Sequence, residues 1–93
     1  MELPVNYNKL HHRQKRAVRE AYIKQQDGLC QHCGALLTEG PADEIAKLKV
    51  TPKLYPAGFF NNPVHLHHDH NTEMTIGAVH AYCNAVLWEH HGE

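Results

Sequence analysis

Two short motifs with the same internal spacing stand fifty residues apart in this chain. The first reads Cys30-Gln-His-Cys33 and is followed by Gly34; the second reads His80-Ala-Tyr-Cys83. With two residues between the ligands, a tight turn can direct both side chains toward one metal ion. Gly34 can adopt the backbone conformation that such a turn needs without steric strain. Together the motifs supply a closed, tetrahedral Cys3His zinc set. We favour this interpretation over three unconnected buried thiols.

A stabilising ion also suits the size of the chain. Its 93 residues predict one domain, 1–93, whose hydrophobic core alone would be marginally stable. There are three Cys, an odd number, and we see no signal peptide or apolar run long enough to span a membrane. A secreted disulfide framework is therefore a poor interpretation, and a structural zinc in a cytoplasmic protein without membrane contact is the better one.

Positive charge is concentrated near the start of the chain, although the net charge is only -1. Residues 8–26 contain no Gly or Pro and predict a helix, with Asn8 as its cap, Asp27-Gly28 as its stop and an apolar stripe at Leu10, Ala17, Val18, Ala21 and Tyr22. The basic residues lie largely off this stripe. They form either a solvated face or a face that contacts DNA phosphates through Arg13, Lys15, Arg16 and Arg19.

The middle of the chain predicts a zinc knuckle over 28–37 and an irregular excursion over 38–63. A short helix is expected over 43–50, and Pro52, Pro56, Gly58 and Pro63 make the following part irregular. Tyr55, Phe59 and Phe60 are expected to pack the excursion onto the core, with contact to nucleic-acid bases as the alternative.

Residues 64–93 predict two strands followed by a helix, which makes the fold class α+β. Val64 and Leu66 alternate with histidines as in a half-buried strand. A polar turn over 71–73 leads to a second strand over 74–76, which Gly77 is expected to end. Asn84 is a good N-cap for a C-terminal helix in which Trp88 would belong to the core.

Four ligand-type residues of this region are left over once the zinc set is complete: His67, His68, Asp69 and Asn84. Asn84 directly follows a zinc ligand, so the zinc would fix its position. His67 and His68 are neighbours in a strand and face opposite ways, so they can have different roles. Such separate roles suit phosphodiester hydrolysis. His67 and Asn84 would hold Mg2+ or Mn2+, and neutral His68 would accept a proton from water.

The series CxxC, HLHHDH and HxxCN over residues 28–93 resembles the HNH (ββα-metal, His-Me finger) endonucleases, and among them the phage-encoded branch related to recombination endonuclease VII. The resemblance implies a small zinc-stabilised ββα-metal domain preceded by a basic N-terminal helix, and cleavage of DNA in the cytoplasm of a bacterial host. By position, it makes His67 the first catalytic-metal ligand, His68 the general base and Asn84 the second ligand.

Three positions depart from the family pattern. His67 stands where many relatives have Asp, His80 where the recombination branch has Cys, and Leu87 where that branch has a carboxylate. His65, Asp69 and His70 are candidates for supporting positions around the site.

Two further functions remain alternatives. A non-catalytic zinc module that binds nucleic acid would leave the histidine cluster as an incidental surface patch. A zinc hydrolase of small molecules is disfavoured because a closed Cys3His set has no open coordination position. Monomeric and homodimeric forms are both compatible with the sequence.

Overall fold

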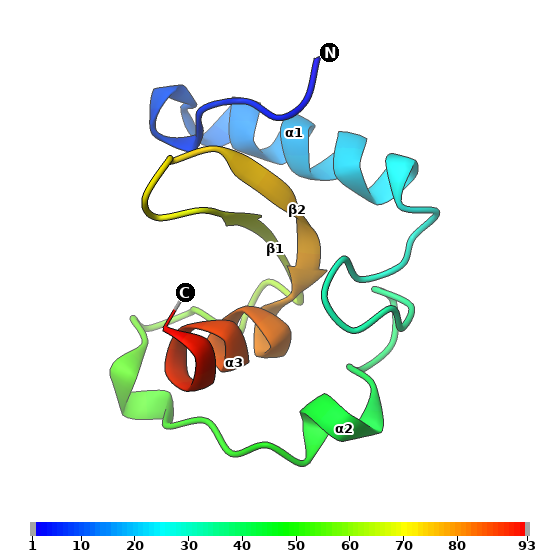
Figure 1. Cartoon of the computed structure of the whole chain (residues 1–93), viewed down its shortest axis with the longest axis vertical. Helices are drawn as coiled ribbons and strands as arrows, with labels where there is room; N and C mark the ends of the chain where they lie inside the picture. The colour runs from blue at the N-terminus through cyan, green and yellow to red at the C-terminus, as the bar shows by residue number, and fades with distance from the viewer. Residues whose placement is uncertain (1, 93) are drawn as a thin grey trace.

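The centre of the molecule is a β-hairpin that lies between two helices (Figure 1). The computed structural model describes residues 2–92. The hairpin consists of β1 (Val64–His68) and β2 (Thr75–His80), which pair antiparallel with Val64 opposite His80. α1 (His12–Gln25) packs against the hairpin from one direction, and α3 (Ala81–His91) follows β2 directly and packs from the other. The predicted α+β class is confirmed.

α1 is shorter at its start than the sequence predicts. The backbone N–H of His11 donates to Oε1 of Gln14, and the helix begins at His12. Residues 7–9 form a separate 3-10 turn, η1 (Tyr7–Lys9), so Asn8 does not cap α1. The predicted stop is confirmed, because Asp27 and Gly28 both have positive φ angles, 55° and 75°. Of the predicted apolar stripe, Val18 and Tyr22 are buried, whereas Ala17 is exposed.

β2 continues through Gly77, so the prediction that this glycine ends the strand is wrong. A Cβ at Gly77 would lie 2.7 Å from Oε1 of Gln26 and 2.8 Å from Cγ of Gln31. The Gln26 amide pairs with the backbone of Ala78 from this side: its Oε1 accepts from the Ala78 N–H at 2.9 Å, and its Nε2 donates to the Ala78 carbonyl at 2.9 Å. Glycine is therefore needed for the close approach of the segment after α1.

The N-terminal segment is tied to the hairpin. Val5 and Thr75 exchange hydrogen bonds, since the Thr75 N–H donates to the Val5 carbonyl at 2.9 Å and the Val5 N–H donates to Oγ1 of Thr75 at 3.0 Å. The Tyr7 N–H donates to the Glu73 carbonyl at 2.8 Å. The segment before η1 therefore pairs along the hairpin and brings Tyr7 to the end of β1.

α3 begins earlier than predicted. Its N-cap is His80 and its first residue is Ala81, so the prediction of Asn84 as N-cap is wrong. The physical reason lies in the second motif: His80 and Cys83 are three residues apart, and one helical turn places them on the same side. Asn84 therefore stands at the end of the first turn of α3, and Gly92, with a φ of 71°, ends the helix.

The excursion passes around α3 (Figure 1). It contains α2 (Asp43–Ala46), which is shorter than predicted, and the 3-10 turn η2 (Pro52–Leu54). Four hydrogen bonds join the excursion to α3. From α3, the side chains of Tyr82 and His90 donate to the carbonyls of Leu48 and Lys49; from the excursion, the Tyr55 hydroxyl donates to the Ala85 carbonyl and the Thr51 N–H donates to the Glu89 carboxylate. Trp88 was expected in the core, but it is 53% exposed. That prediction is wrong because the indole lines an open cavity and does not pack into the core cluster.

The described core is small. It combines residues of α1, the knuckle, the hairpin and α3: Val18, Tyr22, Cys30, Leu37, Leu66, Ala78, Val79 and Cys83. No helix within residues 2–92 is long and apolar enough to cross a membrane.

Candidate functional site

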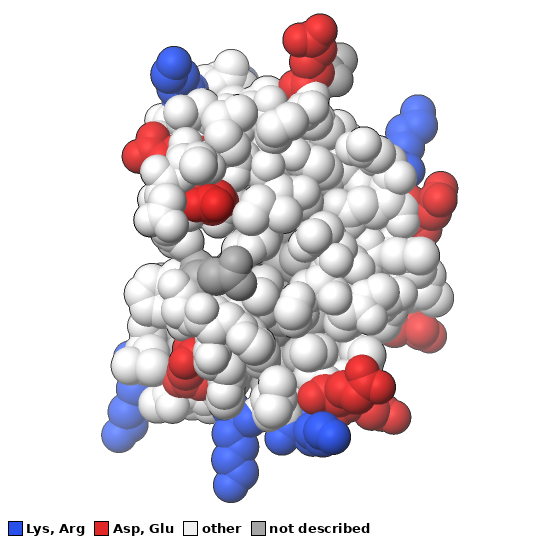
Figure 2. Space-filling view, in the orientation of Figure 1, with Lys and Arg blue, Asp and Glu red and all other residues white. Residues whose placement is uncertain are grey.

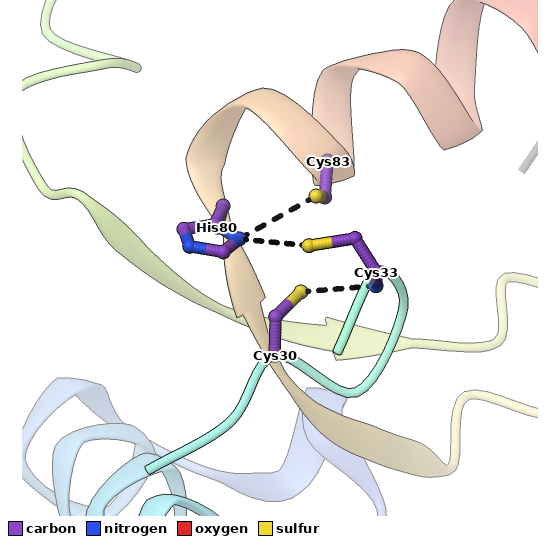
Figure 3. Close-up of side chains that lie close together, drawn as sticks. All are labelled: Cys30, Cys33, His80 and Cys83. Carbon is purple, nitrogen blue, oxygen red and sulfur yellow. Dashed lines mark hydrogen bonds between the residues drawn. The ribbon is translucent and has the colours of Figure 1, made fainter. Parts of the chain in front are cut away.

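The two matched motifs meet beside the end of β2. Figure 3 shows the four side chains converging, two from the loop after α1, one from the end of β2 and one from the first turn of α3. The candidate ligand atoms of this set, Cys30, Cys33, His80 and Cys83, all lie within 4.8 Å of one another. The predicted Cys3His cluster is therefore assembled by the fold and is capable of holding a zinc ion.

Backbone hydrogen bonds shape the knuckle. The Gly34 N–H donates to the Cys30 carbonyl at 2.9 Å, and the Cys30 N–H donates to the Ala35 carbonyl at 2.8 Å. Gly34 has a φ of 79°, a conformation that disfavours other residues, so the glycine after the second cysteine closes this turn. The Cys33 N–H points to Sγ of Cys30 at 3.5 Å, which favours a thiolate there.

The imidazole of His80 is held in the tautomer that a metal ligand needs. Its Nε2 lies 2.9 Å from the Leu36 carbonyl, which can only accept, so Nε2 carries the proton. Nδ1 then presents its lone pair, and it lies 3.4 Å from Sγ of Cys33 and 3.6 Å from Sγ of Cys83. A ligand histidine oriented by a backbone carbonyl is a recurrent feature of zinc sites.

The thiols of Cys30 and Cys83 are close neighbours in the cluster, so one can stabilise the deprotonated form of the other. Donation by Cys83 lowers the pKa of Cys30 to about 4, with burial opposing the shift and backbone N–H groups adding to it. The same hydrogen bond, together with burial, raises the pKa of Cys83. One thiolate thus forms readily, and a divalent ion at the cluster would take the place of the donated proton.

The second feature is a cavity of about 580 Å³ that is lined by Asn84 and by β1. Its lining draws on α1, the hairpin, α3 and the excursion, and includes His12, Lys15, Arg19, Tyr55, Phe59, His65, His67, His68, His70, Asn84 and Trp88. Among the described residues, none that lines it carries a carboxylate, while Lys15 and Arg19 carry positive charge. The cavity therefore favours an anion.

Asn84 is oriented by His65. Nε2 of His65 lies 2.8 Å from the Phe59 carbonyl and must donate to it, so Nδ1 is the acceptor in the neutral ring. Nδ2 of Asn84 lies 3.1 Å from that Nδ1 and donates to it. Burial lowers the pKa of His65, which favours this neutral form. The amide oxygen of Asn84 is not used by the contact with His65 and can serve as a ligand.

His68 is held by stacking. The centre of its ring lies 3.8 Å from the centre of the Tyr7 ring, and the two ring planes are nearly parallel, with an angle of 7° between them. The centre of the His70 ring lies 4.7 Å from that of His68. The pKa of His68 is lowered first by burial and then by electrostatic repulsion from Lys15 and from His70 and His67 when these are protonated, while Glu73 opposes the shift. The neutral form of His68 is therefore favoured near neutral pH, and it can accept a proton.

His67 and Asp69 have different surroundings. His67 is only 4% exposed although it lines the cavity. Oδ1 of Asp69 accepts hydrogen bonds from the N–H groups of Asn71 at 2.7 Å and Thr72 at 3.2 Å, which lowers the pKa of this carboxyl. Asp69 thus stabilises the hairpin turn.

Within residues 2–92, the Cys3His set is the one group of three or more His, Cys, Asp or Glu side chains close enough to share an ion.

The four basic residues expected to contact DNA divide into two pairs. Lys15 and Arg19 line the cavity, and Nζ of Lys15 lies 4.1 Å from the centre of the Tyr7 ring. Arg13 and Arg16 are exposed outside its lining, and Nε of Arg16 pairs with Oε1 of Glu20 at 3.2 Å. On the face that Figure 2 shows, charged residues of both signs lie mainly along the outline, so the described residues form no large basic patch there.

His12 and Tyr7 line the cavity but were not singled out from the sequence. His12 lies three and seven positions before Lys15 and Arg19, a helical spacing that could have placed it on the same face. Tyr7 had no detectable signal, because its position depends on pairing between the N-terminal segment and the hairpin.

Comparison with known protein families, with curated proteins and with solved structures found no match in any of the three. The fold and the site together define a small α+β protein with a two-stranded antiparallel sheet and a Cys3His cluster suited to zinc.

Proposed function

We propose that this chain is a zinc-stabilised, metal-dependent DNA endonuclease of the ββα-metal (HNH) class. The observation that carries the proposal is the cavity along β1, where His67, His68 and Asn84 line the same space as Lys15 and Arg19. The order of β1, β2 and α3, with Asn84 directly after the last cysteine of the cluster, agrees with the resemblance seen in the sequence.

The zinc set has a structural role in this proposal. It joins the knuckle to the start of α3 and so holds Asn84 beside β1. All four ligands come from the protein, which leaves no open position for substrate. The chemistry is therefore assigned to the neighbouring cavity.

His67 and the amide oxygen of Asn84 would hold a divalent ion in that cavity. Such an ion supplies charge stabilisation at the scissile phosphate and at the leaving 3′ oxygen. The two protein ligands are neutral and, among the described residues, no carboxylate lines the cavity. These residues would therefore bind Mg2+ or Mn2+ only weakly, and the phosphate of bound DNA would supply further ligands that raise the affinity.

His68 is the general base in this proposal. Stacking on Tyr7 fixes its ring, and its lowered pKa keeps one ring nitrogen available as an acceptor. His68 would accept a proton from water while the water oxygen attacks phosphorus and the bond from phosphorus to the 3′ oxygen breaks. Lys15 and Arg19 would contact adjacent phosphates, since they line the same cavity.

Supercoiled plasmid incubated with the zinc-loaded protein tests the proposal. We expect relaxed or linear DNA only when Mg2+ or Mn2+ is added. His68→Ala should reduce cleavage by roughly 10²- to 10⁴-fold, the usual contribution of a general base. His91→Ala is the matched control, because His91 is exposed and does not line the cavity. Plasmid that stays supercoiled with either metal would contradict the endonuclease proposal.

A non-catalytic zinc module that binds nucleic acid is the second candidate. The observation that favours it is that, within residues 2–92, only the closed Cys3His set forms a metal-type cluster of three or more such ligands. The plasmid experiment separates the two, since this candidate predicts a shift of DNA mobility without any cleavage.

A further inference from the structure

Aromatic side chains form much of the cavity lining outside the candidate catalytic residues. Tyr55, Phe59 and Trp88 all line it. The ring centres of Tyr55 and Phe59 lie 4.6 Å apart, and Phe59 also lies 4.6 Å from His65. Trp88, on the later part of α3, is 53% exposed. A large indole left this open beside a cavity indicates a surface that receives a flat apolar partner.

The same cavity provides positive charge. Lys15 and Arg19 reach it from α1, and among its described lining residues there is no carboxylate to oppose them. A nucleotide combines the two matching properties, a flat base and an anionic phosphate. Neither an apolar peptide nor a simple anion would use both parts of the lining.

The aromatic part of the cavity favours unpaired DNA over a duplex. In a duplex each base face is covered by its stacked neighbours, and a protein reaches only the base edges in the grooves. Aromatic side chains can stack on base faces where the strand is single or the base is turned out. Exposed Trp88 beside the cations of α1 therefore fits a single strand better than a duplex.

We propose that this cavity binds an unpaired nucleotide of DNA, with its base on Trp88 and neighbouring phosphates on Lys15 and Arg19. The preferred substrate is then DNA with a single-stranded segment at the cleavage site. This statement about the substrate rests on the proposed endonuclease function, whereas the binding itself can be measured without any cleavage.

Trp88 is the only tryptophan of the chain, so its fluorescence reports directly on the cavity. Zinc-loaded protein without added Mg2+ or Mn2+ is titrated with a short oligodeoxythymidylate and, separately, with a blunt hairpin duplex. We expect the single strand to quench the emission and to bind more tightly than the duplex. An emission that does not respond to the single strand, or equal affinities for the two DNAs, would overturn the inference.

Substitutions at Trp88 test the stacking interaction, with affinity measured by the anisotropy of a labelled oligodeoxythymidylate. Trp88→Ala should weaken single-strand binding by roughly 5- to 150-fold, the worth of one base–aromatic stack, and Trp88→Phe should retain most of the affinity. Leu29→Ala is the control, because Leu29 is 40% exposed and does not line the cavity. Thermal melts establish that each variant is folded, and wild-type affinity in folded Trp88→Ala would contradict the proposal.

The outcome is separate from that of the plasmid experiment. Single-strand binding that depends on Trp88, in a protein that cuts no DNA with either metal, supports this site and rejects the endonuclease. Cleavage that shows no preference for single-stranded segments and no effect of Trp88→Ala rejects this site and leaves the endonuclease standing.

Discussion

The side-chain amide of Asn84 donates a hydrogen bond to Nδ1 of His65 at 3.1 Å, while Nε2 of the same imidazole lies 2.8 Å from the Phe59 carbonyl. The ring therefore has one acceptor and one donor, each with a defined partner. This interaction links the excursion to α3 through β1 and fixes which way the amide of Asn84 faces. His65 is thus placed as a positioning residue for a candidate metal ligand.

His65→Ala should raise the Mg2+ or Mn2+ concentration needed for half-maximal cleavage by roughly 10- to 100-fold, as is usual when the supporting partner of a ligand is removed. The maximal rate at saturating metal should fall much less, because the base and the ligands remain. His65→Gln, whose amide can still accept from Asn84, should restore part of the metal affinity. Metal titrations of plasmid cleavage measure both quantities, and an unchanged metal requirement in His65→Ala would show that the hydrogen bond has no role in metal binding.

The roles of His68 and Asn84 can be separated by the same titration. In the proposed mechanism Asn84→Ala removes a metal ligand, so added metal should recover much of its activity. In the same mechanism His68→Ala removes the proton acceptor, so added metal should not recover it. Full recovery of His68→Ala at high metal would make His68 a ligand, and His70, 4.7 Å from its ring, would become the next candidate for the base.

The pH dependence of cleavage follows from the lowered pKa of His68, whose main cause is burial. In the proposed mechanism His68 acts as the base in its neutral form, so activity should be flat above the ordinary imidazole pKa of about 6.5 and fall only as the pH drops through the lowered value. Glu73 raises this pKa. Glu73→Gln should therefore move the acid limb of the kcat profile to still lower pH, and a shift to higher pH would contradict the assignment.

Disruption of the zinc set should unfold the domain. Cys33→Ser removes one of four converging ligands, and structural zinc contributes on the order of 10 kcal/mol to small folds of this kind. We expect no bound zinc by metal analysis and no cooperative thermal transition. His32→Ala is a matched control, since His32 lies between the two cysteines of the knuckle but outside the cluster. A Cys33→Ser protein that keeps one zinc per chain and melts cooperatively would refute the site.

The two pairs of basic residues on α1 should differ in their effect on DNA binding. Lys15→Ala with Arg19→Ala removes the cations of the cavity and should lower the salt slope by about 0.7 to 0.9 for each phosphate that is no longer neutralised. Arg13→Ala with Arg16→Ala changes the charge equally but lies outside the cavity, so its effect should be smaller. Binding measured over a range of salt concentrations decides this, and equal slopes for the two double variants would show that the basic face acts only through its net charge.

Much of the local structure follows from local sequence. The stop at Asp27-Gly28, the turn at Gly34 and the hairpin followed by a helix depend on neighbours in the chain, and the structure has all three. The zinc set could also be predicted, although its halves are fifty residues apart, because each half carries the ligand spacing of a single turn.

The errors concern positions where packing between distant segments overrides local preference. Gly77 has the sequence character of a strand break, but the approach of Gln26 and Gln31 requires a residue without Cβ inside β2. Asn84 is a good N-cap, but the pairing of His80 with Cys83 places the N-cap four residues earlier, at His80. Trp88 has the hydrophobicity of a core residue and is exposed because it lines an open cavity, where the centre of the His70 ring lies 6.2 Å from that of the indole.

The sequence by itself determined the α+β class and the four zinc-type ligands, because short-range spacing sets both turn geometry and the direction of neighbouring side chains. Only the tertiary structure decided what surrounds the candidate catalytic residues: Tyr7 stacked on His68, His65 bonded to Asn84, and Lys15 and Arg19 beside the aromatic side chains of one cavity. These interactions join residues far apart in the chain, and their geometry depends on how α1, the hairpin, the excursion and α3 pack together.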